Sequence, residues 1–465
     1  MTIATLRLSA VILTILAFVQ GWGAAHANEP VRLGDELGTP DWLSLGGSYR
    51  IRYETLDNPF RAGLEGSTGI LVQRLLFNVR ADFDGLYLGA ELQDSRAHFV
   101  DPSTPLGTDD VNTFELLRAY AGWQGTDVFR AGDRLDLRVG RLTLNIASRR
   151  LAARQNSRNT VNAFTGFHGT WTGARGLTLH TFAVFPIDRR PNDRASLLEN
   201  EVAFDRENFD RLFWAVHATQ KDLIGRASGE FYVFGLHERD RPLVQSRNRR
   251  LVTPGLRFLI APKKGHWDFD LETALQVGTS RLSSAPTDIT DRNHLAGLFH
   301  IHVGYTFDAP WSPRLHVQYD LATGDGDPDD GRNGRFDTLF GDRSFELGPT
   351  GIHGALARSN LNSPSLRLEF KPGRRLSGYA AYRAVFLASS RDAHTTSRVR
   401  DASGASGSFV GQQIEGRLRF ELIPGNIRLE SGFAALFKGR FLKTAPNAPP
   451  PGDTLYFYAA STFTF

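Results

Sequence analysis

The stretch His266-Trp-Asp-Phe-Asp-Leu-Glu-Thr-Ala-Leu-Gln-Val-Gly278 alternates between two kinds of side chain. Its odd positions from 267 to 277 are mostly apolar, whereas the even positions carry Asp268, Asp270, Glu272 and Gln276. Successive side chains of a β-strand point to opposite faces, so this pattern predicts a strand with one apolar and one charged face. The charged face would lie in water in a soluble sandwich, or in the lumen of a membrane barrel.

The same alternation recurs along the chain and predicts an all-β fold. The expected strands cover residues 43–55, 71–83, 85–98, 114–124, 136–146, 164–173, 177–187, 209–220, 226–238, 249–261, 266–278, 294–307, 313–324, 359–370, 376–389, 409–422, 426–439 and 454–465. They number about 18, and an even count is typical of a single-chain antiparallel barrel in a bacterial outer membrane.

The connections between these strands favour the barrel. They are long after odd-numbered strands, as at 325–358, and mostly short after even-numbered strands, as at Asp84; the segment 125–135 is the exception. Short periplasmic turns and long extracellular loops produce this asymmetry in transmembrane barrels. The expected periplasmic strand ends also collect the tryptophans that an interfacial girdle requires, namely Trp42, Trp123, Trp171, Trp267 and Trp311.

The two ends of the chain support an outer-membrane location in a Gram-negative cell. Arg7, an apolar run at 8–19 and the cleavage pattern Ala25-His-Ala27 predict a signal peptide over residues 1–27. The barrel would then occupy residues 28–465 as one domain. The last strand ends on Phe465 and resembles the assembly signal of outer-membrane proteins. Residues 28–41 are too short for a plug domain, which argues against an energy-coupled receptor.

The cationic residues suggest what the lumen handles. Of 54 basic residues, 48 are arginine, a bias that a GC-rich genome could also produce, so position must decide. Strand parity predicts the following lumen residues: Arg74, Arg80, Arg118, Arg138, Arg314, Arg367, Arg383, Arg417 and Arg419, with the acids Asp82, Asp268, Asp270, Glu272, Asp320, Glu369 and Glu421. The alternative for each is an ion-paired wall that braces the barrel without touching a substrate.

Several motifs occur in the order found in the alginate export family, and most of the mature chain resembles that family. They are Leu137-Arg-Val-Gly-Arg141, Ser148-Arg-Arg-Leu151, Phe164-Thr-Gly166, Tyr319-Asp-Leu-Ala-Thr-Gly-Asp-Gly-Asp-Pro328, Phe336-Asp-Thr-Leu-Phe340, Asn360-Leu361 and the stretch 382–392. Leu142 and Thr165 stand where the family usually has Gln and Asp. The resemblance implies a monomeric porin, set in outer-membrane lipid and lipopolysaccharide, that passes an anionic polysaccharide and works with periplasmic secretion proteins.

A uronate polymer has physical requirements that an arginine-rich lumen meets. Each sugar carries a carboxylate, which needs a positive potential, fork-shaped donors and weak binding at many sites. A porin for small anionic solutes or for oligosaccharide uptake would have the same charge and width. The long turn 125–135, with Arg130, Asp133 and Arg134, is a candidate periplasmic gate.

Other chemistries find little support in the sequence. Asp325, Asp327 and Asp329 have the first spacings of a calcium loop, but the glycine is misplaced and Phe336 replaces the final acid, so no metal or cofactor is expected. His300, His302 and His316 form a polar lumen cluster that can take up protons, without a serine at catalytic spacing. The chain is therefore not expected to be an enzyme or to bind nucleic acid.

Overall fold

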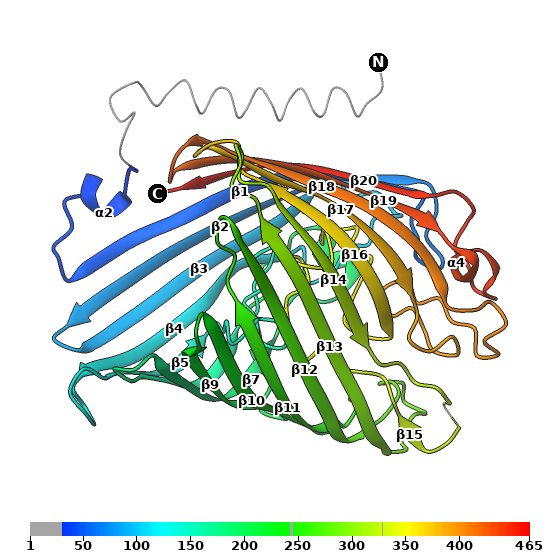
Figure 1. Ribbon diagram of the computed structural model, residues 1–465, viewed down its shortest axis with the longest axis horizontal. Helices are drawn as coiled ribbons and strands as arrows, with labels where there is room; N and C mark the ends of the chain where they lie inside the picture. Colours follow the sequence, from blue (N-terminus) through cyan, green and yellow to red (C-terminus); the bar gives the residue numbers. More distant parts are fainter. Residues whose placement is uncertain (1–29, 242–244, 328) are drawn as a thin grey trace.

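The computed structural model describes residues 30–241, 245–327 and 329–465. The predicted signal peptide lies outside these ranges. In the part of the chain that the structure describes, one sheet contains 20 strands, and two of them, β8 (Arg206–Glu207) and β15 (Arg332–Asn333), are two-residue strands of the loops. The other 18 form a closed antiparallel barrel, because β1 pairs with both β2 and β20 (Figure 1).

The barrel strands follow each other in chain order. Their bounds are β1 (Leu43–Asp57), β2 (Ser67–Phe83), β3 (Leu86–His98), β4 (Asn112–Thr126), β5 (Arg134–Leu142), β6 (Phe164–Thr172), β7 (Leu177–Asp188), β9 (Arg211–Ile224), β10 (Ala227–Glu238), β11 (Arg250–Ile260), β12 (His266–Ser280), β13 (Arg292–Thr306), β14 (Arg314–Ala322), β16 (Leu361–Phe370), β17 (Leu376–Phe386), β18 (Phe409–Ile423), β19 (Ile427–Lys438) and β20 (Thr454–Thr464). Each overlaps one expected strand, so the predicted fold is confirmed.

Helix is confined to short pieces between the strands. The described residues contain α2 (Leu33–Glu36), α3 (Arg194–Leu198) and α4 (Arg440–Thr444). None of their helices is long and apolar enough to cross a membrane.

The burial of β12 shows which face is inside. Asp268, Glu272 and Gln276 are buried, whereas Trp267 and Leu275 are 65% and 50% exposed. A soluble sandwich would have the opposite polarity. An exposed apolar face is stable only against lipid, where every backbone polar group must already be paired, and the closed ladder provides that pairing.

The turns and loops lie at opposite ends of the barrel. The turn between β2 and β3 consists of Asp84 and Gly85, whose φ angles of 45° and 89° suit a tight hairpin. The C-terminus and α2 lie at this turn end, and α4 and β15 lie at the loop end (Figure 1). Trp42 and Trp311, at the turn end, are 49% and 62% exposed, as a girdle requires.

Two long loops fold inward and fill much of the lumen. They are the 143–163 loop after β5 and the 323–360 loop after β14, and they meet where Ala152 bridges to Phe340. Phe340 packs against Phe164 and Phe213 of the wall, with ring centroids 5.3 and 4.8 Å apart. The interior is therefore a packed core with cavities rather than an open tube.

Candidate functional site

Two of the cavities among the described residues lie on either side of the inward-folded loops. The outer cavity, of about 680 Å³, lies among the extracellular loops and is lined by segments 61–64, 102–110, 343–351 and 395–398. The inner cavity, of about 600 Å³, is lined by β1, β2 and β16–β20. Thr350 lines both cavities, so the 323–360 loop stands between them.

The inner cavity carries a large excess of positive charge. Among the described residues, its lining includes nine arginines and three carboxylates. The arginines are Arg50, Arg52, Arg74, Arg149, Arg154, Arg367, Arg417, Arg419 and Arg428, and the acids are Asp342, Glu369 and Glu430. Arg52, Arg154 and Arg428 pair with Glu54, Glu91 and Glu421 outside this lining, so the net excess is smaller, and low-dielectric walls strengthen the positive potential that remains.

Arg50 and Arg74 face each other across the β1–β2 ladder at the edge of the inner cavity. Nη2 of Arg50 donates to the carbonyl oxygen of Arg158 (2.6 Å), and Nη1 of Arg74 donates to the same oxygen (3.0 Å) and to that of Asn156 (3.2 Å). Neither forms an ion pair with a carboxylate of the described ranges. Two cations thus fasten the 143–163 loop to the wall through backbone carbonyls and the side-chain amide oxygen of Asn159, with no carboxylate.

Three further arginines of the inner cavity lie against aromatic rings. The guanidinium carbon of Arg367 lies 3.6 Å from the ring centroid of Tyr379, and that of Arg417 lies 4.9 Å from it. Arg149 lies 4.7 Å from the ring centroid of Phe345. Stacking of this kind orients a guanidinium group while leaving its edge donors free for a carboxylate.

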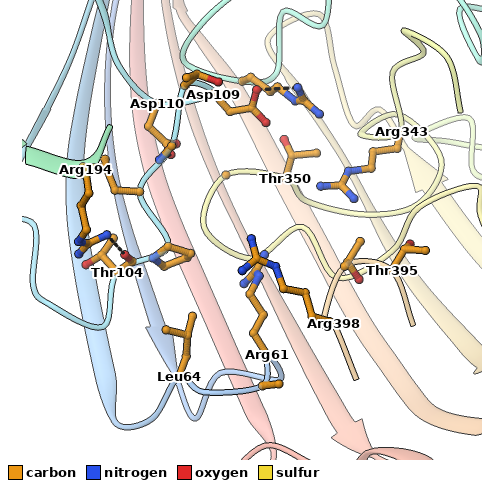
Figure 2. Close-up of a pocket in the computed structure, with 18 of the residues that line it drawn as sticks. Arg61, Leu64, Thr104, Asp109, Asp110, Arg194, Arg343, Thr350, Thr395 and Arg398 are labelled. Atoms are coloured by element: carbon orange, nitrogen blue, oxygen red, sulfur yellow. Dashed lines mark hydrogen bonds and ion pairs between the residues drawn. The ribbon is translucent and has the colours of Figure 1, made fainter. Parts of the chain in front are cut away.

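The outer cavity is also cationic (Figure 2). Arg61, Arg194, Arg343 and Arg398 line it without an ion pair to any carboxylate that the structure describes, whereas Arg158 and Asp109 are paired at 2.7 Å. Burial lowers the pKa of Arg61 to about 10 and that of Arg343 to about 9. Both groups therefore stay charged at neutral pH.

Asp110 is the titratable acid of the outer cavity. Burial, together with the nearby carboxylates of Asp109 and Glu54, raises its pKa to about 7. Its side chain also accepts a hydrogen bond from the backbone N–H of Gly107 at 3.0 Å. The charge of this cavity therefore depends on pH near neutrality.

The nine arginines predicted from strand parity all lie on the inner face, but most of them have carboxylate partners. Arg80 contacts Asp82, Arg118 contacts Glu91, Arg138 contacts Asp136, Arg314 contacts Asp268 and Glu369, Arg367 contacts Glu369, Arg383 contacts Asp320, and Arg419 contacts Glu430. Only Arg74 and Arg417 of the nine lack an ion pair within the described ranges.

The opposite wall, formed by β11–β14 with the loops packed against it, is an ion-pair network. Arg150 of the 143–163 loop is fully buried and contacts Asp270 at 3.0 Å as well as Glu272 and Glu346. Arg257 donates to both carboxylate oxygens of Asp270, at 2.7 and 2.8 Å. The donors of these arginines are already used, so this wall has little capacity for a passing anion.

The predicted gate segment is a compact turn. The carboxylate of Asp133 accepts hydrogen bonds from the backbone N–H groups of Val128 (2.8 Å), Phe129 (3.1 Å) and Arg130 (3.0 Å). The indole N–H of Trp171 on β6 donates to the same carboxylate at 3.0 Å. Arg130 and Arg134 are exposed. The turn is therefore self-capped and fastened to the neighbouring strand.

Sequence reasoning missed several residues of the two cavities. Arg50 and Arg52 alternate with Ile51 in β1, so the parity rule that found Arg74 could have found them. The loop arginines, Arg61, Arg343 and Arg398, carry no such signal, because the inward path of a loop is set by tertiary packing.

Comparison with known proteins agrees with this architecture. Residues 41–449 match the family described as alginate export. No curated protein gives a significant match. Among solved structures, the outer membrane protein OpdK of Pseudomonas aeruginosa aligns with a TM-score of 0.56 and 11% identity, over 91% of this chain and 98% of that one. OccK2 (OpdF) of the same organism aligns with a TM-score of 0.57 and 11% identity, over 90% and 98%. At such low identity these two structures support the fold alone.

Proposed function

Because the chain belongs to the alginate export family, whose match spans residues 41–449, we propose that this outer-membrane channel passively conducts an anionic uronate polymer such as alginate. The observation that carries the proposal is the set of arginines around both cavities that have no carboxylate partner among the described residues. These are Arg50, Arg74, Arg149 and Arg417 in the inner cavity, and Arg61, Arg194, Arg343 and Arg398 in the outer one.

The chemistry of these arginines suits a moving polyanion. A carboxylate entering the inner cavity can replace the backbone carbonyls that Arg50 and Arg74 now bind, so binding and release of the loop are coupled. Charge-assisted bonds to guanidinium groups are stronger than bonds to neutral acceptors, which favours this exchange. Several weak sites in series allow the next sugar to displace the last one, so the polymer keeps moving.

A second function, a porin for small anionic solutes or oligosaccharide uptake, is favoured by the division of the lumen. Cavities of about 600 and 680 Å³ lie within the usual size range of small-molecule sites. The two functions differ in how binding depends on chain length. A polymer spanning both cavities should bind more tightly as it lengthens, whereas a small-solute site should saturate with one or two sugars.

We base the proposed oligomeric state, membrane environment and partners on the family. The barrel would act as a monomer in outer-membrane lipid and lipopolysaccharide, and periplasmic secretion proteins would deliver the polymer. The exposed apolar side chains of the wall, such as Leu275 and Val317, are the surface that lipid would cover. The family is one of channel proteins, and we propose no catalytic step.

The test is current block of the purified barrel in a planar bilayer. Uronate oligomers of increasing length are added to one side, and carboxyl-reduced oligomers of the same length serve as the neutral control. We expect block by the uronates alone, with an affinity that rises with length. Block that saturates at one or two sugars would favour the small-solute porin, and equal block by neutral oligomers would refute an arginine-based site.

A further inference from the structure

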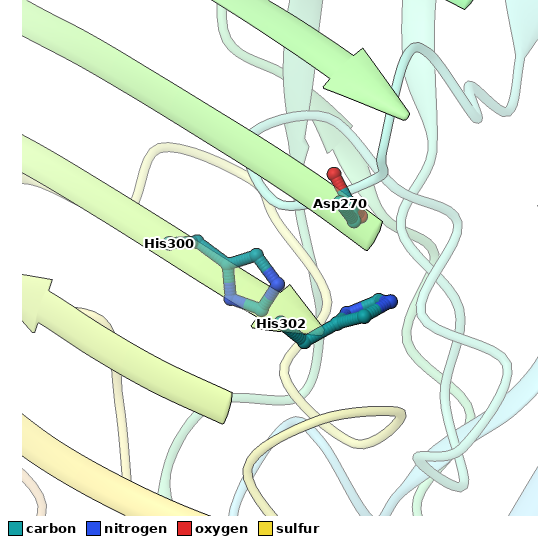
Figure 3. A group of neighbouring side chains, drawn as sticks. All are labelled: Asp270, His300 and His302. Carbon is teal, nitrogen blue, oxygen red and sulfur yellow. The ribbon is translucent and has the colours of Figure 1, made fainter. Parts of the chain in front are cut away.

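A group of imidazole and carboxylate side chains lies on the ion-paired wall, outside both cavities. Asp270 of β12 and His300 and His302 of β13 each offer one ligand atom, and these atoms lie within 4.8 Å of one another. Figure 3 shows the three side chains on neighbouring strands. His302 is opposite Asp270 in the ladder, and His300 is two residues away on the same face. The β-strand register alone thus brings them together.

The orientation of His300 indicates a free lone pair. Its Nδ1 lies 2.8 Å from Oδ1 of Asp320, so Nδ1 carries the proton and donates it to that carboxylate. Nε2 is then an acceptor, and it is buried with no hydrogen-bond partner in the described structure. A carboxylate that orients an imidazole from behind in this way is the usual outer partner of a metal-binding histidine.

The carboxylate nearest to Nε2 of His300 does not form a hydrogen bond with it. Oε1 of Glu346, on the 323–360 loop, lies 3.8 Å from Nε2 of His300. The same Oε1 accepts a hydrogen bond from Nη2 of Arg150, so a guanidinium group already compensates the charge of this carboxylate. At 3.8 Å, Oε1 and Nε2 are too far apart for a hydrogen bond, so Glu346 leaves the lone pair of His300 Nε2 without a partner in the described structure.

The ion-pair network around this group contains one more carboxylate than guanidinium groups. With the histidines neutral, it holds seven carboxylates and six guanidinium groups among the described residues. The acids are Glu230, Asp268, Asp270, Glu272, Asp320, Glu346 and Glu369, and the bases are Arg150, Arg257, Arg314, Arg358, Arg367 and Arg383. Buried charge of one sign is costly, so one uncompensated negative charge favours uptake of a cation.

A third histidine adjoins the group. The rings of His302 and His316 have centroids 5.3 Å apart, and neither ring nitrogen of the buried His316 has a hydrogen-bond partner within the described ranges. Gly304 lies opposite His316 in the ladder. A Cβ at this glycine would come within 3.0 Å of the Cβ of His316 and 2.9 Å of the carboxylate of Asp268, so the side chains are closely packed here.

We propose that this cluster binds a divalent transition metal ion of the zinc class through His300 Nε2, His302 and the carboxylate of Asp270, which the ion would share with Arg150 and Arg257. Imidazole and carboxylate ligands together suit zinc better than calcium or magnesium, which prefer oxygen alone. The proposal does not depend on which solute the channel carries, and it departs from the sequence-based expectation of no metal.

The first test is metal retention by the full chain, folded in detergent micelles and stripped with a chelator. After equilibration with Zn²⁺ and removal of free ion, elemental analysis should find close to one zinc per chain. His300→Ala and His302→Ala should weaken binding more than about 100-fold, and Asp320→Asn, which removes the orienting carboxylate, by about 10–100-fold. His180→Ala, in a separate histidine stack on β6, β7 and β9, is the matched control and should bind as the wild type does.

A second measurement uses the wild-type protein, so its result does not depend on whether the variants fold. Titration of the stripped wild-type barrel with Co²⁺ should produce the visible bands of a tetrahedral site, with imidazole coordination in its X-ray absorption spectrum. Zinc should then displace the cobalt. Absence of stoichiometric binding by the wild type would mean that a proton occupies the site, and it would overturn the proposal. Unchanged binding by a folded His300→Ala and His302→Ala pair would overturn it equally.

Discussion

The two walls of the lumen use arginine in opposite ways. Along β11–β14 and the loop packed against them, guanidinium groups such as Arg150 and Arg257 are surrounded by buried carboxylates and have few donors left. Along β1, β2 and β18, Arg50, Arg74 and Arg417 have no carboxylate partner among the described residues. The comparison teaches that the number of arginines in a lumen says little about its function. The positions of the acids decide which wall is structural and which can bind an anion.

The largest effect should come from Arg150, which can be compared with its neighbour Arg149. Arg150 is fully buried between three acids, whereas Arg149 is exposed in the inner cavity. Arg150→Ala should lower the free energy of unfolding by about 3–5 kcal/mol, because it leaves buried carboxylates unpaired. Arg149→Ala should change it by less than about 0.5 kcal/mol. Equilibrium unfolding in urea, followed by tryptophan fluorescence, measures both, and equal losses would contradict the division into two walls.

A second effect should appear in the size of the pore. Replacing Arg50 and Arg74 together by Ala removes the donors that hold the carbonyls of Asn156 and Arg158, each bond to a charged group contributing about 1.5–3 kcal/mol. The 143–163 loop should loosen and the single-channel conductance should rise.

High salt is the condition for this measurement, since screening then limits the direct effect of the lost charges. The control is the pair Arg80→Ala with Asp82→Ala, which removes one ion pair far from the loop. If both double variants conduct alike, Arg50 and Arg74 do not restrain the loop.

A smaller effect should follow pH through Asp110, whose pKa of about 7 lies above its value in the unfolded chain. Folding favours its protonated form, so its contribution to stability is present at low pH and is lost as the pH rises from about 4 to about 7. Protonation also removes a negative charge from the outer cavity, so anion selectivity should increase as the pH falls from about 8 to 6. Asp110→Asn should abolish that step in a bilayer recording, and a step that persists would assign it to another group.

The smallest effect is expected at the turn end. Shortening the predicted gate at 125–135 should raise conductance only slightly, because the turn is capped by Asp133 and held by Trp171 rather than by lumen contacts. Arg130→Ala with Arg134→Ala keeps the turn length and serves as the control. Conductance identical to that of the wild type after shortening would remove the gate hypothesis altogether.

The sequence predicted the strands well because alternation is a local property. Every strand of the barrel overlapped an expected one, and Asp268, Asp270 and Glu272 lay on the inner face. The ion-pair partners of the lumen arginines could not be predicted from the sequence, because Arg150 and Glu346 come from loops that are distant in the chain from β12. The motif containing Arg150 was recognisable, but its burial between three acids depends on how the loop folds back into the lumen.

The most direct test of the account is the zero-current potential of the barrel in a planar bilayer under a salt gradient. Three proteins are compared: the wild type, Arg417→Gln, which removes a cation without a carboxylate partner, and Arg419→Gln with Glu430→Gln, which removes a complete ion pair from the same strand region. We predict an anion-selective wild type, a shift toward cations in Arg417→Gln and no shift in the double variant. A cation-selective wild type, or the same shift in both variants, would contradict the claim that arginines without carboxylate partners set the selectivity of this channel.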